Sequence, residues 1–261
     1  MTLDGFQRFE LEHGGMRRRI YRSGEGPAVI VIHEVPGITP DVERFARLVA
    51  DDGFTVMLPH LFGTPGKPYG DLYAVGQIVR ACIAREFHVL AAGHASPITE
   101  WLRALCRHAH REIGGPGVGV VGMCLTGNFA LALMADASVM APVLSQPSLP
   151  FPFGARRKRA LHVSNEALEA ARRRADHENL RLLGLRFSHD WMCPPERFAR
   201  LREVFGARFE AVEIDSGPDN AHGIPRTAHS VLSRDLVDRD GHPTRAALAR
   251  VLALFHDTLD G

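Results

Sequence analysis

Short apolar stretches that alternate with helix-like stretches constrain the fold of this chain more than any other feature. Five consecutive apolar residues at Ala28–Ile32 precede a helical pattern at Pro40–Asp52, and the same succession recurs toward the C-terminus. Such continuous apolar runs are typical of parallel strands buried on both faces. Phe6–His13 and Met16–Tyr21 flank a Gly14-Gly15 turn, which predicts a hairpin. We therefore expect an α/β fold with a mainly parallel sheet, helices on both of its faces and an N-terminal hairpin.

The other elements are predicted from the same patterns. Strands are expected at Phe54–Leu58, Val118–Val121, Ser138–Leu144, Arg181–Phe187 and Arg208–Ile214, and helices at Asp71–Ala92, Pro97–Glu112, Leu125–Met134, Asn165–Arg174, Pro195–Phe205 and Thr244–Leu259. Sheets of this kind bind ligands at the carboxyl ends of their strands. The residues that follow each strand are therefore the candidates for function.

Composition narrows the class of protein. The chain has 261 residues, which we expect to form a single domain over residues 1–261. Its 31 basic and 30 acidic residues leave a net charge of +1, so we predict no nucleic-acid partner. We also predict no membrane association, because no run of about 18 apolar residues exists. Four widely spaced cysteines and the lack of a signal-like N-terminus indicate reduced thiols and a cytoplasmic protein.

Cys124 is the candidate nucleophile. The apolar run Val118–Val121 ends at Gly122, Cys124 follows two residues later, and a helical pattern begins at once. This is the sequence form of a strand–nucleophile–helix elbow, with Cys where Ser is usual. The helix N-terminus would favour a thiolate there. Because no serine in the chain has a glycine two positions before it, no serine elbow competes with Cys124.

An acid and two histidines follow later strands. Asp190 comes after Arg181–Phe187, and His222 and His229 come after Arg208–Ile214. The chain order nucleophile, acid, histidine is that of the α/β-hydrolases. In such a triad Cys124 attacks a carbonyl carbon, a histidine moves the proton, and Asp190 orients the imidazole. The oxyanion needs two backbone N–H donors, which we expect from Leu125 and Val35.

Three segments together resemble the dienelactone hydrolase family: Gly122-Met123-Cys124-Leu125-Thr126-Gly127, the turn His33-Glu34-Val35-Pro36-Gly37, and Asp190 followed by Cys193-Pro194. The resemblance extends from about residue 16 to 259. It implies the α/β-hydrolase fold, a Cys–Asp–His triad, no cofactor, and small esters or lactones as substrates. It also implies that Glu34 interacts with the resting thiol of Cys124 and takes part in its activation.

The chain departs from that family in two places. Thr126 stands where the family usually has glycine, which narrows the elbow. The loop after Ile214 is longer than usual and carries two histidines. His229 lies 26 residues before Phe255, and this spacing agrees better with the family than the spacing from His222 does. We therefore favour His229 as the triad histidine and keep His222 as the alternative.

We interpret the chain as an ester or lactone hydrolase that works through a thioester on Cys124. The alternative from another class is a non-catalytic α/β-hydrolase-like protein that binds a small molecule, and a third is a redox-sensing thiol. Gly117–Gly122 matches a dinucleotide fingerprint only literally, because it is the strand itself. We predict no metal centre, since His108 and His110 point different ways on a helix and lack partners. The sequence does not predict the oligomeric state.

Overall fold

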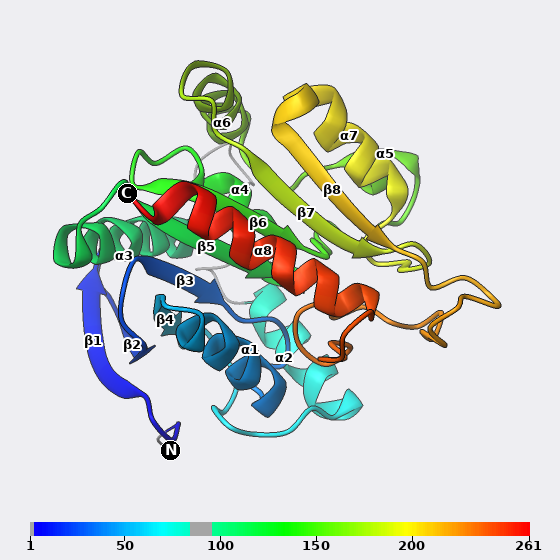
Figure 1. Ribbon diagram of the computed structural model, residues 1–261, viewed down its shortest axis with the longest axis horizontal. Helices are drawn as coiled ribbons and strands as arrows, with labels where there is room; N and C mark the ends of the chain where they lie inside the picture. Colours follow the sequence, from blue (N-terminus) through cyan, green and yellow to red (C-terminus); the bar gives the residue numbers. More distant parts are fainter. Residues whose placement is uncertain (1–2, 84–95) are drawn as a thin grey trace.

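The computed structural model describes residues 3–83 and 96–261, and its centre is one eight-stranded sheet. The strand order is β1-β2-β4-β3-β5-β6-β7-β8. The strands are β1 Gln7–His13, β2 Met16–Ser23, β3 Ala28–Ile32, β4 Thr55–Pro59, β5 Val118–Met123, β6 Val139–Ser145, β7 Leu182–Phe187 and β8 Phe209–Ile214. β1 and β2 form the predicted hairpin and β2 pairs antiparallel with β4, whereas the pairs from β4 to β8 are parallel. The predicted mainly parallel sheet with an N-terminal hairpin is confirmed (Figure 1).

Helices cover both faces of the sheet. α1 (Pro40–Asp51) and α8 (Pro243–Leu259) cross the near face in Figure 1. α3 (Pro97–Ile113), α4 (Gly127–Leu133), α6 (Asn165–His177) and α7 (Pro195–Phe205) pack into the second apolar core. The period-two alternation of a strand divides the side chains between the two cores. In β3, Val29 and Val31 join the α1 and α8 side, and Ile30 and Ile32 join the other.

Several helices begin where the sequence supplies a cap. The side chains of Thr39, Ser96 and Ser164 accept hydrogen bonds from the backbone of the first turns of α1, α3 and α6. Each such cap stabilises a helix by about 1 kcal/mol. Proline follows the cap directly in α1 and α3, where its missing N–H is harmless.

The structure differs from the sequence prediction at two helices, and a third can be compared only in part. The helix expected at Leu125–Met134 begins as a 3₁₀ turn at Cys124–Thr126 and continues as α4. A short helix, α5 (Ala155–Arg159), was not predicted, because four basic residues in a row show no apolar periodicity. α2 spans Asp71–Ile83, and the rest of the predicted Asp71–Ala92 lies outside the described residues.

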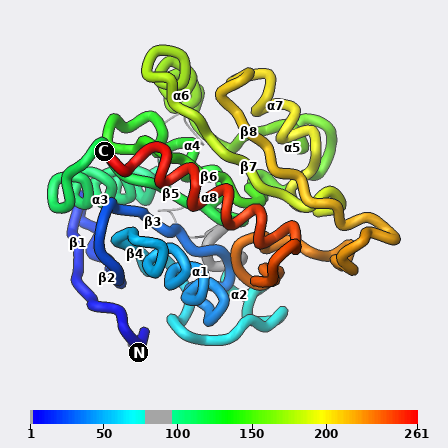
Figure 2. The backbone as a smooth tube through the Cα atoms, viewed as in Figure 1, coloured from blue at the N-terminus to red at the C-terminus, as the bar shows by residue number. Residues whose placement is uncertain are grey.

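The segment between β8 and α8 leaves the edge of the sheet and turns back toward the start of α8 (Figure 2). It carries both candidate histidines, so its path decides which of them reaches the middle strands. Within residues 3–83 and 96–261, no helix is long and apolar enough to cross a membrane.

Candidate active site at the carboxyl ends of the strands

The backbone at Cys124 makes the sharp turn that the sequence predicts. Cys124 has a φ of 55°, a left-handed conformation that is unfavourable for a residue with a Cβ. A Cβ at Gly122 would lie 2.4 Å from the carbonyl oxygen of Thr126, and one at Gly127 would lie 2.6 Å from Cα of Pro147. Both positions therefore require glycine, and the turn leaves the Cys124 side chain half-buried instead of enclosed.

Thr126 is fully buried and ties the elbow to the neighbouring strand. Its hydroxyl oxygen accepts a hydrogen bond from the Met123 amide at 3.0 Å, and its one proton can be donated to the carbonyl oxygen of Met123 at 2.9 Å or of Ile32 at 3.0 Å. The carbonyl of His33 is 3.2 Å away. The expectation that Thr126 merely narrows the elbow is incomplete, because its hydroxyl joins the ends of β5 and β3.

His229 and Asp190 form a buried pair. Nδ1–H of His229 donates to Oδ2 of Asp190 at 2.7 Å, while Oδ1 of Asp190 accepts from the Met192 amide at 3.0 Å. The loop of His229 is held by Asp235, whose Oδ2 accepts from the backbone amides of His229 and Ser230 at 2.8 Å each. The imidazole thus presents Nε2 away from Asp190, with Ser148 Oγ 3.4 Å from that nitrogen.

His222 lies elsewhere in the same loop. It is exposed, and its ring stacks edge-on against His242 with 5.4 Å between centroids. Among the described residues, Asp190 makes its imidazole contact with His229 and not with His222.

Two buried arginines hold the loop that carries Asp190. Arg186 donates to the carbonyls of Cys193 and Ser188 at 2.8 and 2.9 Å, one on each side of Asp190, and pairs with Glu213. Arg197 on α7 donates to the Met192 carbonyl at 3.2 Å. It also donates to carbonyls in the segment that follows β6, those of Pro147, Pro150, Arg157 and Ala160. Arg197 therefore links the acid loop to the segment that carries Ser148.

Glu34 is buried directly after β3 and is surrounded by hydrogen-bond donors. Its carboxylate accepts from Ser230 Oγ at 2.9 Å, from Gln146 Nε2 at 3.2 Å, and from Ser233 Oγ. Burial raises the pKa of Glu34, and the hydrogen bonds from Ser233 and Ser230 and the positive charge of His229 oppose that rise. Glu34 therefore joins the end of β3 to the His229 loop.

The structure brings Glu34, Cys124 and His229 together. One side-chain ligand atom from each lies within 4.8 Å of those from the other two. Burial alone would lower the pKa of His229, but the charge of the Cys124 thiolate and the hydrogen bonds with Asp190 and Cys124 outweigh it and raise the pKa well above its ordinary value. The imidazole of His229 therefore favours its protonated form between the Asp190 carboxylate and the sulfur of Cys124.

Val35 and Leu125, from which we expect the oxyanion N–H groups, lie in one small apolar cluster with Ala74. Cys124 and Phe62 pack against its edge. The two other cysteines whose side chains are described, Cys106 and Cys193, are fully buried, and burial raises the pKa of both thiols. Cys124 is therefore the accessible thiol among these three.

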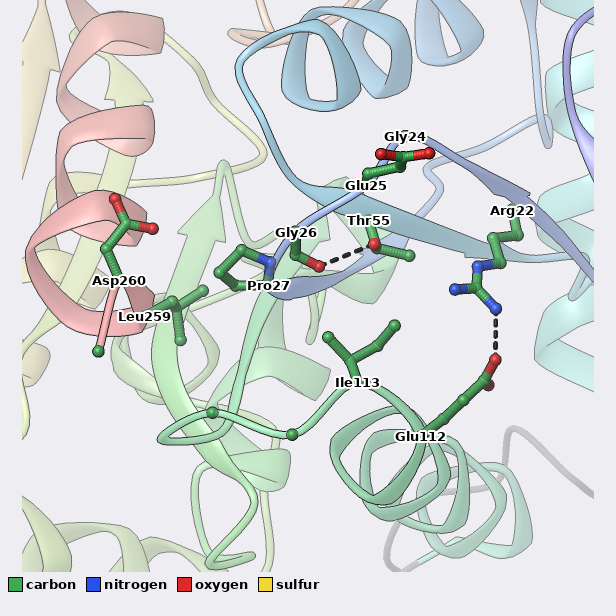
Figure 3. A pocket seen from close by; sticks show the side chains of 13 residues that line it. Arg22, Gly24, Glu25, Gly26, Pro27, Thr55, Glu112, Ile113, Leu259 and Asp260 are labelled. Carbon is green, nitrogen blue, oxygen red and sulfur yellow. Dashed lines mark hydrogen bonds and ion pairs between the residues drawn. The ribbon is translucent and has the colours of Figure 1, made fainter.

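A surface groove at the other end of the sheet contains no such cluster. It lies between Arg22, Thr55, Glu112 and Asp260, where β3, β4 and β5 begin (Figure 3). Arg22 and Glu112 form an ion pair across it. Because ligands of parallel sheets bind at the opposite ends of the strands, this groove is not the candidate site.

Sequence reasoning missed the polar residues that support the site. Gln146 and Ser148 follow β6, and neither is a nucleophile, acid or imidazole that would mark a catalytic position in the sequence. Ser230 and Ser233 lie just after His229 and read as ordinary loop residues. The position of the first pair at the carboxyl end of a middle strand is the signal that marks it, whereas single serines in a loop form no pattern.

Comparisons with known proteins agree with this architecture. The chain superposes on a crystal structure assigned as a dienelactone hydrolase from Klebsiella pneumoniae subsp. pneumoniae with a TM-score of 0.63 and 18% identity, over 97% of this chain and 99% of the other. A cold-adapted esterase from an Arctic intertidal metagenomic library gives 0.60 and 14%, over 99% and 97%. A dienelactone hydrolase-like promiscuous phosphotriesterase from metagenomic libraries gives 0.58 and 16%, over 98% and 99%.

These likenesses define the fold class, which is that of the α/β-hydrolases. A comparison with curated protein sequences returned no significant match. The family model described as "Dienelactone hydrolase family" matches residues 18–259. The chain therefore belongs to the dienelactone hydrolase family and is a hydrolase.

Proposed function

We propose that the protein hydrolyses a small ester or lactone through a thioester on Cys124, with His229 and Asp190 completing the triad. The observation that carries the proposal is the convergence of three side chains from distant parts of the chain. Cys124 lies on a strained elbow within 4.8 Å of a ligand atom of His229, and Asp190 binds the other side of that imidazole at 2.7 Å.

In the first half-reaction the Cys124 thiolate attacks the carbonyl carbon of the substrate. The developing oxyanion accepts hydrogen bonds from the backbone N–H groups of Val35 and Leu125. When the tetrahedral intermediate collapses, the carbon–oxygen bond to the alkoxide breaks, and His229 donates its proton to that oxygen. A lactone gives a ring-opened acyl-enzyme, and an open-chain ester releases an alcohol.

In the second half-reaction His229 removes a proton from water, which attacks the thioester carbonyl. The carbon–sulfur bond breaks, the carboxylic acid leaves, and the thiolate–imidazolium pair is restored. Asp190 keeps Nδ1 protonated, so that Nε2 carries out both proton transfers. Glu34, whose carboxylate lies within 4.8 Å of the sulfur, is a positioning residue in this scheme.

The positive charge of Arg234 favours substrates that carry a negative charge. Arg234 is five residues after His229, its guanidinium lies 4.6 Å from the Tyr69 ring centroid, and its positive charge acts on Glu34. A cation on this side of the site attracts esters and lactones that carry a negative charge. Arg234→Met is expected to raise KM for an anionic ester at least tenfold and to leave KM for a neutral ester of the same size within about twofold. Equal changes for both esters would reject this preference.

The histidine pair provides a matched test of the triad. His229→Ala is expected to lower kcat for an activated ester by at least 10³-fold, because both proton transfers depend on it. His222→Ala changes a histidine in the same loop and is expected to leave kcat within about twofold. The reverse result would transfer the role to His222.

A second measurement separates hydrolysis from simple binding. Iodoacetamide is expected to alkylate Cys124 much faster than the buried Cys106 and Cys193, with loss of activity in proportion to labelling. A Cys124 thiol as slow as Cys193, in a protein without esterase activity, would reject the proposal and favour the binding-protein alternative.

A further inference from the structure

The three side chains around the sulfur also form the donor set of a metal site. We propose that Glu34, Cys124 and His229 bind Zn²⁺ reversibly and that the bound ion switches the protein off. Thiolate, imidazole and carboxylate are the ligands that zinc prefers. The binding of the ion concerns coordination alone, whereas the loss of activity rests on the proposed function of Cys124.

The geometry is close to that of an open zinc site. The three ligand atoms lie within 4.8 Å of one another. Zinc–ligand bonds of about 2.0–2.3 Å in a tetrahedron put neighbouring ligand atoms about 3.5 Å apart. Movements of about 1 Å, shared among three side chains, therefore bring them to bonding distance. Three protein ligands leave a fourth position for water.

Further hydrogen bonds already orient two of the three ligands. Asp190 holds Nδ1 of His229 at 2.7 Å, so Nε2 is the nitrogen that faces the metal position. This carboxylate–histidine arrangement is the one that fixes imidazole ligands in zinc proteins. The Glu34 carboxylate is held by Ser230, Ser233 and Gln146. Those donors fix the position of the carboxylate oxygens beside the sulfur and the imidazole.

Charge also favours a divalent ion. Coordination by a thiolate and a carboxylate would place two negative charges next to Zn²⁺ in a largely buried site, where the ion neutralises both. Coordination displaces the proton that Cys124 and His229 share, and this proton is released to solvent. No atom changes oxidation state. The sulfur lone pair then bonds the metal and cannot attack a carbonyl. Mg²⁺ and Ca²⁺ prefer six or more oxygen ligands and are not expected to bind.

Direct binding to the folded chain tests the proposal. Titration with ZnCl₂ in a calorimeter is expected to give one site per chain, and Co²⁺ is expected to produce the ultraviolet and visible bands of a tetrahedral, thiolate-bound ion. Glu34→Gln keeps the shape of the side chain but removes its charge, and is expected to weaken Zn²⁺ binding at least tenfold. Cys124→Ser is expected to remove the cobalt–thiolate band.

His222→Ala is the control, because His222 is an exposed histidine in the same loop that could bind zinc at the surface. Binding that survives His222→Ala, is lost in Cys124→Ser and protects Cys124 from iodoacetamide supports the proposal. Binding that is lost in His222→Ala, or is equal in Glu34→Gln and the parent protein, would overturn it.

The two proposals fail separately. A cobalt–thiolate band in a protein without esterase activity would retain the metal site and reject the hydrolysis. Esterase activity that is unaffected by saturating Zn²⁺, without a cobalt band, would reject the metal site and retain the hydrolysis.

Discussion

Thr126→Val is the substitution that best tests how the elbow is held. Valine has nearly the shape of threonine, but it lacks the hydroxyl that accepts from the Met123 amide and lies 3.0 Å from the Ile32 carbonyl oxygen. The side chain is fully buried, so water cannot replace either partner. A buried hydrogen bond contributes about 1 kcal/mol net, and an unpaired buried group costs more.

Two lost hydrogen bonds predict a fall of about 2–3 kcal/mol in the free energy of unfolding. For a chain of this size each 1 kcal/mol lowers Tm by about 2–4 °C, so Tm is expected to fall by about 4–12 °C. Thr126→Ser is the matched control. It keeps the hydroxyl and loses one methyl group, which removes only about 1 kcal/mol.

The rate of catalysis gives a second measurement of the effect of the Thr126 hydroxyl. Because Thr126 joins the ends of β5 and β3, it sets Leu125 relative to Val35, the two proposed oxyanion donors. Thr126→Val is therefore expected to lower kcat for an activated ester at least tenfold more than Thr126→Ser does, with KM nearly unchanged. Equal stability and equal kcat for the two variants would refute the argument that the hydroxyl holds the elbow.

Three further predictions concern the surroundings of the triad. Asp190→Asn should lower kcat by about 10²–10⁴-fold with little change in KM, because the imidazole loses its orienting acceptor; a small effect would argue against Asp190 as the triad acid. Arg197→Met should destabilise the protein by about 2–4 kcal/mol in urea unfolding, because it leaves several buried carbonyls unpaired. Arg200→Met, on the exposed side of the same helix, should change the free energy of unfolding by less than about 0.5 kcal/mol. Similar values for both variants would contradict the role of Arg197 in linking the acid loop to the segment that carries Ser148. Burial lowers the pKa of His33 to about 3. Below about pH 6.5 this imidazole therefore binds a proton in the unfolded chain but stays neutral in the folded chain. Stability should therefore fall by about 2 kcal/mol between pH 8 and pH 5, and the fall should be smaller by that amount in His33→Gln; parallel curves would contradict it.

Local sequence patterns were enough to predict most of the helices and strands. Strand β3 at Ala28–Ile32 and helix α7 at Pro195–Phe205 have the predicted bounds, because one is a continuous apolar run and the other lies between a proline and a glycine. The 3₁₀ turn at Cys124–Thr126 was not predicted, because it depends on the hydrogen bonds that Thr126 makes to a strand more than 90 residues away in sequence.

The candidate site was only partly predictable for the same reason. Chain order and strand ends were enough to propose Cys124 and Asp190, since each follows a strand or its turn, whereas the role of Glu34 came from the family resemblance. The loop after β8 has no periodic pattern, and its spacing to Phe255 favoured His229 only by comparison with the family. The contacts of the loop show that His229 binds Asp190 and that His222 is exposed. The support from Arg197 and Ser233 depends on tertiary contacts that the sequence pattern does not show.

Trapping the acyl-enzyme tests the central proposal most directly. The Asp190→Asn variant should slow hydrolysis of the thioester, so brief reaction with an activated ester followed by acid quenching should increase the intact mass by one acyl group. Peptide mapping should place that group on Cys124, and neutral hydroxylamine should remove it as it does other thioesters. An acyl group mapped to another residue would contradict the account. A Cys124→Ala protein that still hydrolyses the ester would contradict it as well.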